Sequence, residues 1–532
     1  MEEAENGVRS RSPTRASGNG VRKLPPSPTR ENGVRNRSPT RAPANGVRKL
    51  SPSPTRSSAP EQRKPSASPP PPRVPRWLIL DRIVHRSSRR RCGVVEDDAT
   101  ASALAHDCVG RPVRASLRIA DPPAVSRLYI HWTGRPPIEG FSEPTAIAAH
   151  RNSILFHMAT PFEDPLMWSR GPFFPDDYFV YSCSSSSPPT LTLLPPCFHG
   201  GDTNPKLDNF FQPYRNQQQR IMLDQDVGIL CHGDEGEFTV AQLAFSENDE
   251  FELCVLHHAP PASGISKEWS VKKVQNPPDM KINIYSWMTD VVVPIGRCLC
   301  WVDYYQGMLL VDVLTDSSSD PDHQQSLRYI PLPKKALKSR RPYRDAGSPD
   351  PLRCVCVTDN DIIKLVCILT ERPASSCPFA ITTWTLDDKH EGKWTMDVDT
   401  TMGAEKIFSL FGAGHSFLPR VQPSFPLVSL GDPDVICFLL KDKDRGLFWM
   451  IEVNMRNKKL QSSALYISEE EEGYPPKRGR RNNFFGHYFT PSKFSSYLSE
   501  DAITSWELSE KMQEAKKERV MQKIGLEAKL KK

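Results

Sequence analysis

Long hydrophobic runs are missing from this chain of 532 residues. No stretch approaches the ~18 consecutive apolar residues that a membrane-spanning helix requires. The opening residues, MEEAENGVRS, are polar and lack the apolar core of a secretory signal. The sequence therefore predicts a protein that is neither transmembrane nor secreted, located in the nucleus, the cytoplasm or both.

Aromatic residues and cysteine are absent from residues 1–76. This segment holds sixteen Lys and Arg, five Asp and Glu, and fifteen of the 51 prolines. Its net charge is +11, whereas the rest of the chain keeps 53 of the 69 basic and 58 of the 63 acidic residues and carries −5. So little apolar surface cannot offset the entropy of folding, which is ~1–2 kcal/mol per residue. We therefore predict that residues 1–75 form a disordered basic tail, rich in Pro, Ser and Arg.

A repeated phrase fills this tail. NGVRSRSPTR (6–15) returns as NGVRNRSPTR (32–41), and NGVRKLPPSPTR (19–30) returns as NGVRKLSPSPTR (45–56). Each copy ends in Ser-Pro-Thr-Arg, which resembles the site of a proline-directed kinase, and the candidate phosphosites are Ser12, Ser27, Ser38 and Ser53. Four phosphates would lower the tail's charge from +11 to about +3 to +5. The alternative is a duplicated neutral linker that its arginines keep solvated.

The composition changes at Trp77, where short β-rich runs begin. They are rich in Val, Ile, Phe, Tyr and Trp and are separated by turn residues, which is typical of strands. The expected strands are 76–81, 126–132, 153–158, 177–183, 190–195, 226–232, 237–245, 251–257, 268–274, 297–303, 307–314, 327–333, 353–359, 362–369, 379–386, 393–398, 434–442, 446–453 and 459–467. Because few helical patterns intervene, this order favours an antiparallel all-β domain over residues 76–498.

The expected strands also fall into groups of three or four. The groups begin near residues 77, 147, 227, 298, 354 and 427. One flat sheet of about twenty strands is disfavoured, because open sheets rarely exceed ~10 strands. A β-propeller avoids this problem by repeating four-stranded blades around an axis, so we predict an all-β, propeller-like fold of about six blades. A stacked pair of sandwiches is the alternative.

The thirteen cysteines include two Cys-x-Cys pairs, Cys298 with Cys300 and Cys354 with Cys356. Side chains two apart on a strand share a face, so two such pairs brought together would supply four thiolates for zinc. Structural zinc, however, more often uses Cys-x₂₋₄-Cys on turns, and free cysteine is among the most buried residue types. Buried, reduced thiols are therefore the preferred interpretation, and we expect no metal or other cofactor.

The motif WVDYYQG (301–307) is the sharpest local signal in the body of the chain. Asp303 is placed to accept backbone N–H groups at a hairpin end, and Gly307 is expected to supply the positive φ of a tight turn. Trp301 is expected in the core. Tyr304 and Tyr305 are the candidate recognition loop, because they are expected to be exposed at a propeller rim.

A family resemblance rests on longer phrases. CLCWVDYYQGMLLVDVL (298–314) followed by LRYIPLP (327–333) resembles the hallmark of a plant family, expanded in grasses, called domain of unknown function 1618. The hallmark region spans about 297–440, and further phrases such as PLVSLGDPDVICFLL (426–440) extend the resemblance over most of the chain beyond the tail. The resemblance implies no established activity, cofactor or catalytic residue, so no residue role is transferred.

The C-terminal part carries two further features. PPKRGRR (475–481) resembles a nuclear import signal, whose candidate residues are Lys477, Arg478, Arg480 and Arg481. Residues 499–532 have a helical spacing of apolar residues and a basic end, and we expect a short helix there.

These patterns favour a non-enzymatic scaffold for unidentified protein partners, with the basic tail as the substrate of a proline-directed kinase. One alternative is a hydrolase in a propeller cavity, which would require its histidines and carboxylates to converge; the residues to locate are His131, His150, His157, His232 and Asp303. The other is a nucleic-acid-associated nuclear protein. The tail has no aromatic side chain to stack on a base, so such binding would be weak and unspecific.

Overall fold

The structure is a computed structural model, and it describes the following residues of the chain: 75–86, 100–132, 144–160, 175–198, 219–233, 236–245, 250–259, 268–274, 282, 284–314, 327–338, 351–370, 379–389, 391–468, 489–498, 518, 519 and 522. The chain divides into two units, Met1–Pro69 and Pro70–Lys532, and every described residue lies in the second. The predicted tail and its four candidate phosphosites lie outside the described residues.

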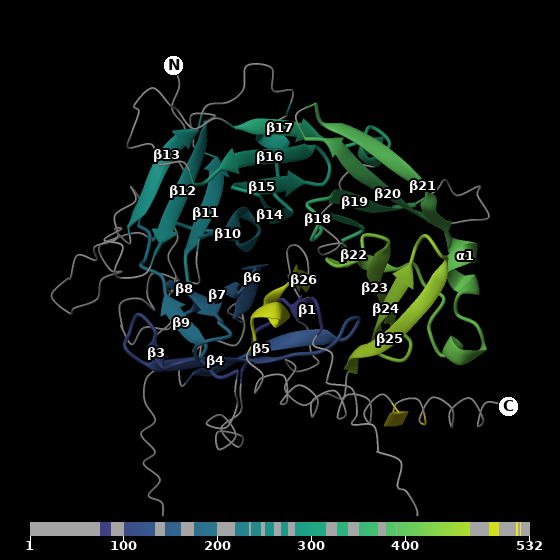
Figure 1. Ribbon diagram of the computed structural model, residues 1–532, viewed down its shortest axis with the longest axis horizontal. Coiled ribbons are helices and arrows are strands. Elements are labelled where there is room, and N and C mark those ends of the chain that lie inside the picture. Colours follow the sequence, from purple (N-terminus) through teal and green to yellow (C-terminus); the bar gives the residue numbers. More distant parts are fainter. Residues whose placement is uncertain are drawn as a thin grey trace, which may run out of the picture. The chain divides into compact units, whose positions relative to one another are not determined.

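Six sheets are arranged as the blades of a β-propeller (Figure 1). Five blades are four-stranded antiparallel sheets in which consecutive strands are neighbours, and one sheet has six strands. The predicted all-β propeller of about six blades is therefore confirmed, and the sandwich alternative is wrong. A single short α-helix, α1 (Ala404–Ser409), is assigned as an element among the described residues.

Five blades follow the chain in order. The second is β6 (Thr145–His150), β7 (Ser153–Ala159), β8 (Asp176–Ser182) and β9 (Thr190–Leu193). The third is β10 (Val227–Cys231), β11 (Phe238–Phe245), β12 (Phe251–His258) and β13 (Trp269–Val274). The fourth is β14 (Val291–Ile295), β15 (Cys298–Asp303), β16 (Gly307–Asp312) and β17 (Arg328–Pro331). The fifth is β18 (Arg353–Val357), β19 (Ile363–Thr370), β20 (Phe379–Asp388) and β21 (Lys393–Gly403). The sixth is β22 (Ser424–Val428), β23 (Val435–Asp442), β24 (Leu447–Asn454) and β25 (Lys459–Ser468).

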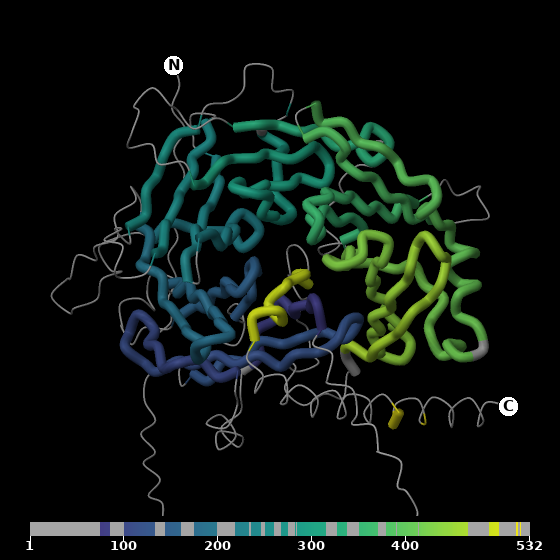
Figure 2. Tube along the Cα trace, in the orientation of Figure 1, coloured from purple at the N-terminus to yellow at the C-terminus, as the bar shows by residue number. Residues whose placement is uncertain are grey.

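The first blade joins strands from both ends of this unit. Its strands are β1 (Leu78–Asp81), β2 (His85–Arg86), β3 (Ala105–His106), β4 (Pro112–Arg118), β5 (Val125–Trp132) and, from far along the chain, β26 (Phe489–Ser492). β26 pairs antiparallel with β1, and β1 pairs parallel with β5. Figure 2 shows this late strand beside the early one. The ring therefore closes through hydrogen bonds between its two ends, which leaves no open sheet at the seam.

The innermost strands β6, β10, β14, β18, β22 and β26 contact one another in that order around the axis, and β26 returns to β6. Three of them contain a proline: Pro294, Pro426 and Pro491. Each innermost strand pairs with a neighbour on one side only, so its other edge needs no N–H donor and tolerates proline.

One glycine lets two inner strands approach closely. Gly228 lies on β10, and a Cβ at this position would come within 2.5 Å of the Cγ1 atom of Val292 on β14. No real Cβ makes such a contact, so a glycine is required where β10 and β14 meet near the axis.

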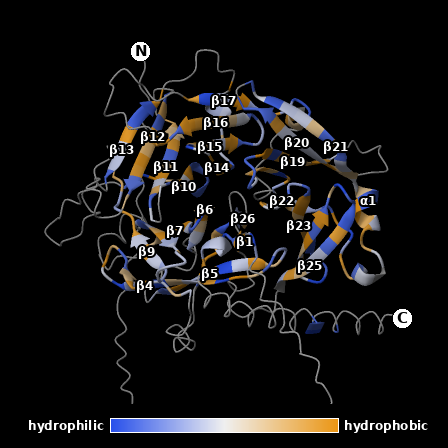
Figure 3. Ribbon diagram, viewed as in Figure 1, coloured by the Kyte–Doolittle hydropathy of each residue, from blue (hydrophilic) through white to orange (hydrophobic). Residues whose placement is uncertain are grey.

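The hydrophobic core is divided among the blades. Six clusters of buried residues occur, and each packs the sheet of one blade against that of the next around the ring. Figure 3 shows the hydrophobic residues distributed along the strands of all blades. Face-to-face packing of neighbouring sheets thus buries both faces of most strands, which explains their nearly continuous apolar sequences.

Short 3₁₀ helices connect some strands: η2 (Asp224–Asp226), η4 (Ile284–Ser286), η5 (Ala336–Lys338), η7 (Ala413–His415) and η8 (Phe494–Tyr497). Of the predicted C-terminal helix over 499–532, the structure describes only Glu518, Arg519 and Gln522, which are helical and exposed. Within the described part of the chain, no helix has the length and apolar character needed to cross a membrane.

Candidate functional site: the central channel

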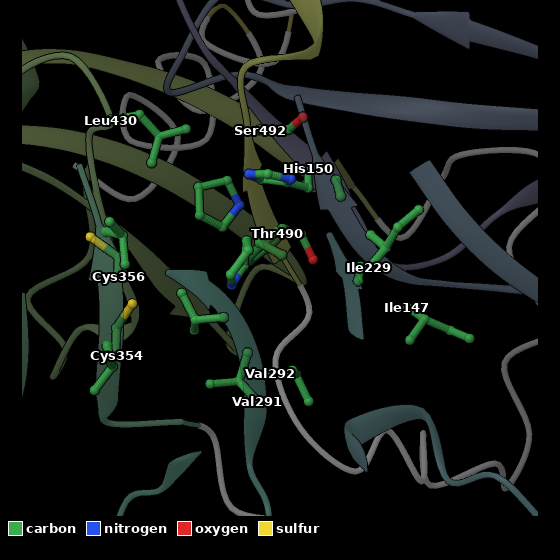
Figure 4. Close-up of a pocket in the computed structure, with 18 of the residues that line it drawn as sticks. Ile147, His150, Ile229, Val291, Val292, Cys354, Cys356, Leu430, Thr490 and Ser492 are labelled. Atoms are coloured by element: carbon green, nitrogen blue, oxygen red, sulfur yellow. The ribbon is translucent and has the colours of Figure 1, made fainter. Parts of the chain in front are cut away.

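The innermost strands surround a cavity of about 520 Å³ (Figure 4). All six of them, and the turns at both of their ends, contribute lining residues. Clefts of ~300–1,000 Å³ are typical of small-molecule sites in proteins. The channel is therefore large enough for a ligand, and its chemistry depends on the side chains that face it.

The walls of the channel are mainly aliphatic. In Figure 4 the side chains of Ile147, Ile229, Val291 and Val292 lie along the same cavity. The run 147–149 of β6 and the run 291–293 of β14 are apolar yet only half-buried. Their remaining accessible surface faces the channel rather than a neighbouring sheet.

Arg82, Asp224 and His157 form a charged cluster where β10 begins. The Arg82 guanidinium donates to Asp224 Oδ2 at 2.8 Å, and His157 Nε2 lies 3.2 Å from Asp224 Oδ1. Burial disfavours the charged form of Asp224, but His157 and Arg82 outweigh burial and lower the pKa of this carboxyl. Asp224 is therefore held ionised between two basic side chains, which is a structural ion pair and not a free general base.

His150 ends β6 at the other end of the inner strands. Its Nδ1 accepts the backbone N–H of Cys231 at 2.9 Å, and the Cys231 thiol donates to the His150 carbonyl at 3.0 Å. Burial, together with the positive charges of Arg151, Lys493 and His232, lowers the pKa of His150 to about 3. The ring is therefore neutral near pH 7. Because Nδ1 is an acceptor, the proton resides on Nε2.

Two basic residues flank His150 at this mouth of the channel. Arg151 follows it in the β6–β7 turn and has a φ of 48°, a left-handed conformation that is uncommon for arginine. Lys493 follows β26, lines the same cavity and pairs with Asp359 at 2.8 Å. The mouth therefore carries basic groups from strands that lie far apart in the sequence.

The motif WVDYYQG forms the β15–β16 hairpin. Trp301 is fully buried, as predicted, and its Nε1 donates to the carbonyl of Asp226 at 2.7 Å. Asp303 is fully buried and accepts the N–H of Tyr305 at 2.8 Å, which confirms the predicted turn, and also the N–H of Met288 at 2.9 Å. The side chain of Asp303 therefore ties the hairpin to the segment before β14.

Gly307 has a role other than the predicted one. It does not have a positive φ, so the expectation of a left-handed turn residue is wrong. A Cβ at Gly307 would lie 2.4 Å from the ring of Tyr329 and 2.7 Å from the carbonyl oxygen of Ile330. The glycine is needed because β17 passes too close for a side chain.

The candidate recognition loop, Tyr304 and Tyr305, is not an exposed pair. Tyr304 is only 4% exposed, packs in the core between the fourth and fifth blades, and its carbonyl accepts a hydrogen bond from Arg353. The expectation that Tyr304 is exposed is therefore wrong. Tyr305 is half-buried, and the Arg353 guanidinium lies 4.2 Å from the centre of its ring. Both tyrosines thus help to join two blades through Arg353.

The cysteines are mainly buried thiols. Cys300, Cys354 and Cys356 are buried and Cys298 is half-buried, and all four are free. Burial raises the pKa of the Cys354 thiol to about 12, which disfavours the thiolate that zinc requires. No group of three or more His, Cys, Asp or Glu side chains among the described residues has an arrangement suited to a metal ion. Cys354 and Cys356 form part of the channel wall.

The histidines and the aspartate that a hydrolase would have to bring together are distributed over different blades. His131 lies on β5 beside Ser116, His157 on β7 beside Asp224, and Asp303 in the β15–β16 hairpin. His150 and His232 lie at the ends of β6 and β10, where His232 contributes to the lowered pKa of His150. The candidate import residues Lys477, Arg478, Arg480 and Arg481 lie outside the described residues.

Sequence reasoning missed the channel mouth. Arg151 and Lys493 belong to turns that show no motif, and they are separated by a long stretch of sequence. The one local signal was the phrase AIAAHRNSILFHM (146–158), in which a polar His-Arg-Asn turn interrupts two apolar runs. That phrase indicates a hairpin but not what the hairpin faces.

Comparison with solved structures finds distant likenesses. A polysaccharide lyase described as PL25-Ulvanlyase is 8% identical with a TM-score of 0.28, over 74% of this chain and 86% of its own. A lectin from Aleuria aurantia, in complex with alpha-methyl-L-fucoside, is 9% identical with a TM-score of 0.28, over 75% of this chain and 98% of its own. A prolyl endopeptidase is 12% identical with a TM-score of 0.26, over 69% of this chain and 41% of its own. At these values the likenesses carry no argument about activity.

No curated protein matches the chain. A family model does match it, over residues 301–437, from the β15–β16 hairpin to β23. This range lies within the hallmark region expected from the sequence, and it supports the resemblance stated above. The family that residues 301–437 match is described as "Protein of unknown function (DUF1618)".

Proposed function

We propose that this chain is a non-enzymatic scaffold whose propeller binds protein partners and whose basic tail regulates that binding. We further propose that the whole of residues 76–498 represents the domain of unknown function 1618, in its plant, grass-expanded form. The observation that carries the proposal is the use of the channel's titratable side chains in internal bonds. Asp224 is paired with Arg82 and His157, and His150 accepts the N–H of Cys231.

The dispersed histidines support the same proposal. General acid–base catalysis needs a titratable group whose pKa lies near the working pH and whose proton is free to move. His150 fails the first condition because its pKa is lowered to about 3. Asp224 fails the second because its pKa is lowered and both of its oxygens are engaged by Arg82 and His157. These groups serve to hold blades together.

The tail provides regulation in this proposal. Phosphorylation of Ser12, Ser27, Ser38 and Ser53 by a proline-directed kinase would reduce its charge from +11 to about +3 to +5. The tail's attraction for an acidic partner surface would fall accordingly. Import into the nucleus through Lys477, Arg478, Arg480 and Arg481 would place the scaffold in both compartments.

The experiment is proximity labelling in the native cells with the full chain and with a chain that lacks residues 1–69, the first of the two units. We expect a set of proteins labelled by both chains, through the propeller, and a subset lost without the tail. A parallel assay measures turnover of chromogenic esters and glycosides by the purified chain. Turnover that disappears in a His150→Gln variant would overturn the scaffold in favour of the hydrolase.

The nucleic-acid alternative makes a separate prediction. Binding through phosphate contacts weakens steeply as salt concentration rises, and it would vanish when the basic tail is removed. Retained nucleic-acid binding after removal of the tail would move the site to the propeller and contradict the proposed division of roles.

A further inference from the structure

The channel has two chemical features that the scaffold proposal leaves unused: aliphatic walls that remain accessible and a basic mouth. The wall residues Ile147 on β6 and Val291 and Val292 on β14 are half-buried and face the cavity. Removing apolar surface from water stabilises a complex by ~25 cal/mol per Å². An aliphatic ligand body would therefore gain free energy by covering these walls.

The mouth offers a hydrogen-bond donor at a fixed position. The Nδ1 atom of His150 is occupied by the N–H of Cys231, so the neutral ring carries its proton on Nε2. Nε2 makes no hydrogen bond within the described part of the chain, and His150 lines the cavity. Figure 4 shows the ring beside Ser492 on β26, with Ile229 and Val292 further along the channel.

The charge around this donor is positive. The permanent charges that lower the pKa of His150 belong to Arg151 and Lys493. His232 acts in the same direction only when it is protonated, and burial lowers its own pKa although Glu237 lies 3.8 Å from its Nδ1. Lys493 is already paired with Asp359, whereas Arg151 has no ion-pair partner among the described residues. The side chain of Asp361 also lines the cavity, but it belongs to the β18–β19 turn. Because β18 is three strands from β6 around the ring, Asp361 lies across the channel from His150. The mouth near His150 therefore has one uncompensated cation, which suits a single negative charge.

From this geometry we propose that the channel binds a small amphipathic monoanion: a carboxylate on an aliphatic chain. The carboxylate contacts the guanidinium of Arg151 and the Nε2–H of His150, and the chain lies along β6 and β14. Arginine's planar fork matches a carboxylate with two parallel hydrogen bonds. This site goes beyond the proposed scaffold function and requires no protein partner.

The backbone of Arg151 provides a clean test variant. Asparagine adopts the left-handed region more readily than arginine, so Arg151→Asn removes the charge without adding strain. Lys458 supplies a matched control, because it is also basic, has a φ of 53° and lies in the β24–β25 turn away from the cavity. Thermal unfolding of both variants verifies that they fold.

The experiment is calorimetric titration of the full chain with decanoate, decanol, acetate and decyl phosphate at one salt concentration. We expect one decanoate per chain and much weaker binding of acetate. Arg151→Asn should weaken decanoate by about tenfold to hundredfold, because a hydrogen bond to a charged group contributes ~1.5–3 kcal/mol. The same variant should leave decanol unchanged, and Lys458→Asn should bind decanoate as the wild type does.

Three results would overturn the proposal. The first is the lack of saturable one-site binding of decanoate. The second is equal decanoate affinity in wild type and Arg151→Asn, which would place the carboxylate elsewhere. The third is tighter binding of decyl phosphate than of decanoate, which would assign the mouth to a dianion. The scaffold proposal is tested by partner labelling and the carboxylate site by calorimetry, so the failure of one proposal does not decide the other.

Discussion

The fully buried carboxylate of Asp303 should be one of the strongest single contributors to stability in the fourth blade. Its Oδ1 accepts the N–H of Tyr305 at 2.8 Å, and its Oδ2 accepts the N–H of Met288 at 2.9 Å and the side-chain amide of Gln306 at 3.2 Å. Replacement by alanine leaves two backbone N–H groups without their acceptors. An unsatisfied buried donor costs ~1–3 kcal/mol, so Asp303→Ala should destabilise the fold by about 4 kcal/mol.

The assay is urea-induced unfolding followed by tryptophan fluorescence, since Trp301 lies in the same hairpin. The entropy of unfolding is ~2.1 cal/mol/K per residue, so over a propeller of roughly 420 residues a loss of 4 kcal/mol lowers the melting temperature by about 5 °C. Asp303→Asn keeps one acceptor oxygen but turns an NH₂ group toward the second N–H, so we expect about half of the effect. The control is Asp444→Ala, an exposed aspartate in the β23–β24 turn, which should change stability by less than ~0.5 kcal/mol. If Asp303→Ala changes the free energy of unfolding by less than the same ~0.5 kcal/mol, the stabilising role of this carboxylate is refuted.

Three further predictions concern other blades. Gly228→Ala should destabilise the fold by ~1–3 kcal/mol in urea unfolding, because its Cβ would overlap Val292; wild-type stability would contradict the close approach of β10 and β14. Burial raises the pKa of Asp177 to about 6, so the folded state holds a proton that the unfolded chain releases. Stability should therefore fall by about 2 kcal/mol as pH rises from 4 to 6, and urea unfolding across this range should show that Asp177→Asn loses this slope. The sulfurs of Cys197 and Cys254 lie 3.6 Å apart, so diamide should accept two electrons and two protons from them and leave a disulfide; peptide mapping that finds only reduced thiols would contradict this.

The fold was largely predictable because blade packing leaves a strong local signal. The middle strands of the blades are buried on both faces, so segments such as 237–245 and 434–442 are nearly continuous apolar runs that indicate strands. The strand prediction omitted β2, β3, β4, β6, β14, β22 and β26. Pro294, Pro426 and Pro491 account for three of these omissions, since proline within a run argues against a strand. Only the ring, which gives each inner strand one unpaired edge, makes those prolines compatible with a sheet.

The site was less predictable than the fold, for reasons visible in particular residues. Tyr304 and Tyr305 follow a strand and precede a glycine, which is the usual context of an exposed turn. Burial of Tyr304 depends on Arg353 from the next blade, to whose side chain the Tyr304 carbonyl is bonded. The sequence around Gly307 likewise indicates a turn glycine, although a glycine is needed there because the ring of Tyr329 on β17 leaves no space for a Cβ. Both errors arise from contacts between strands, which a local pattern does not contain.

Closure of the ring and assembly of the channel mouth depend on the same strand. β26 completes the first blade by pairing with β1, and the residues at its end, Ser492 and Lys493, enter the cavity beside His150. His150 and Lys493 are separated by 342 positions, so nothing in the chain brings them together until β26 docks. The basic mouth is therefore a property of the closed propeller alone. A ligand at this mouth that contacts both His150 and Ser492 bridges β6 and β26, and because it binds only the closed form it stabilises the closure.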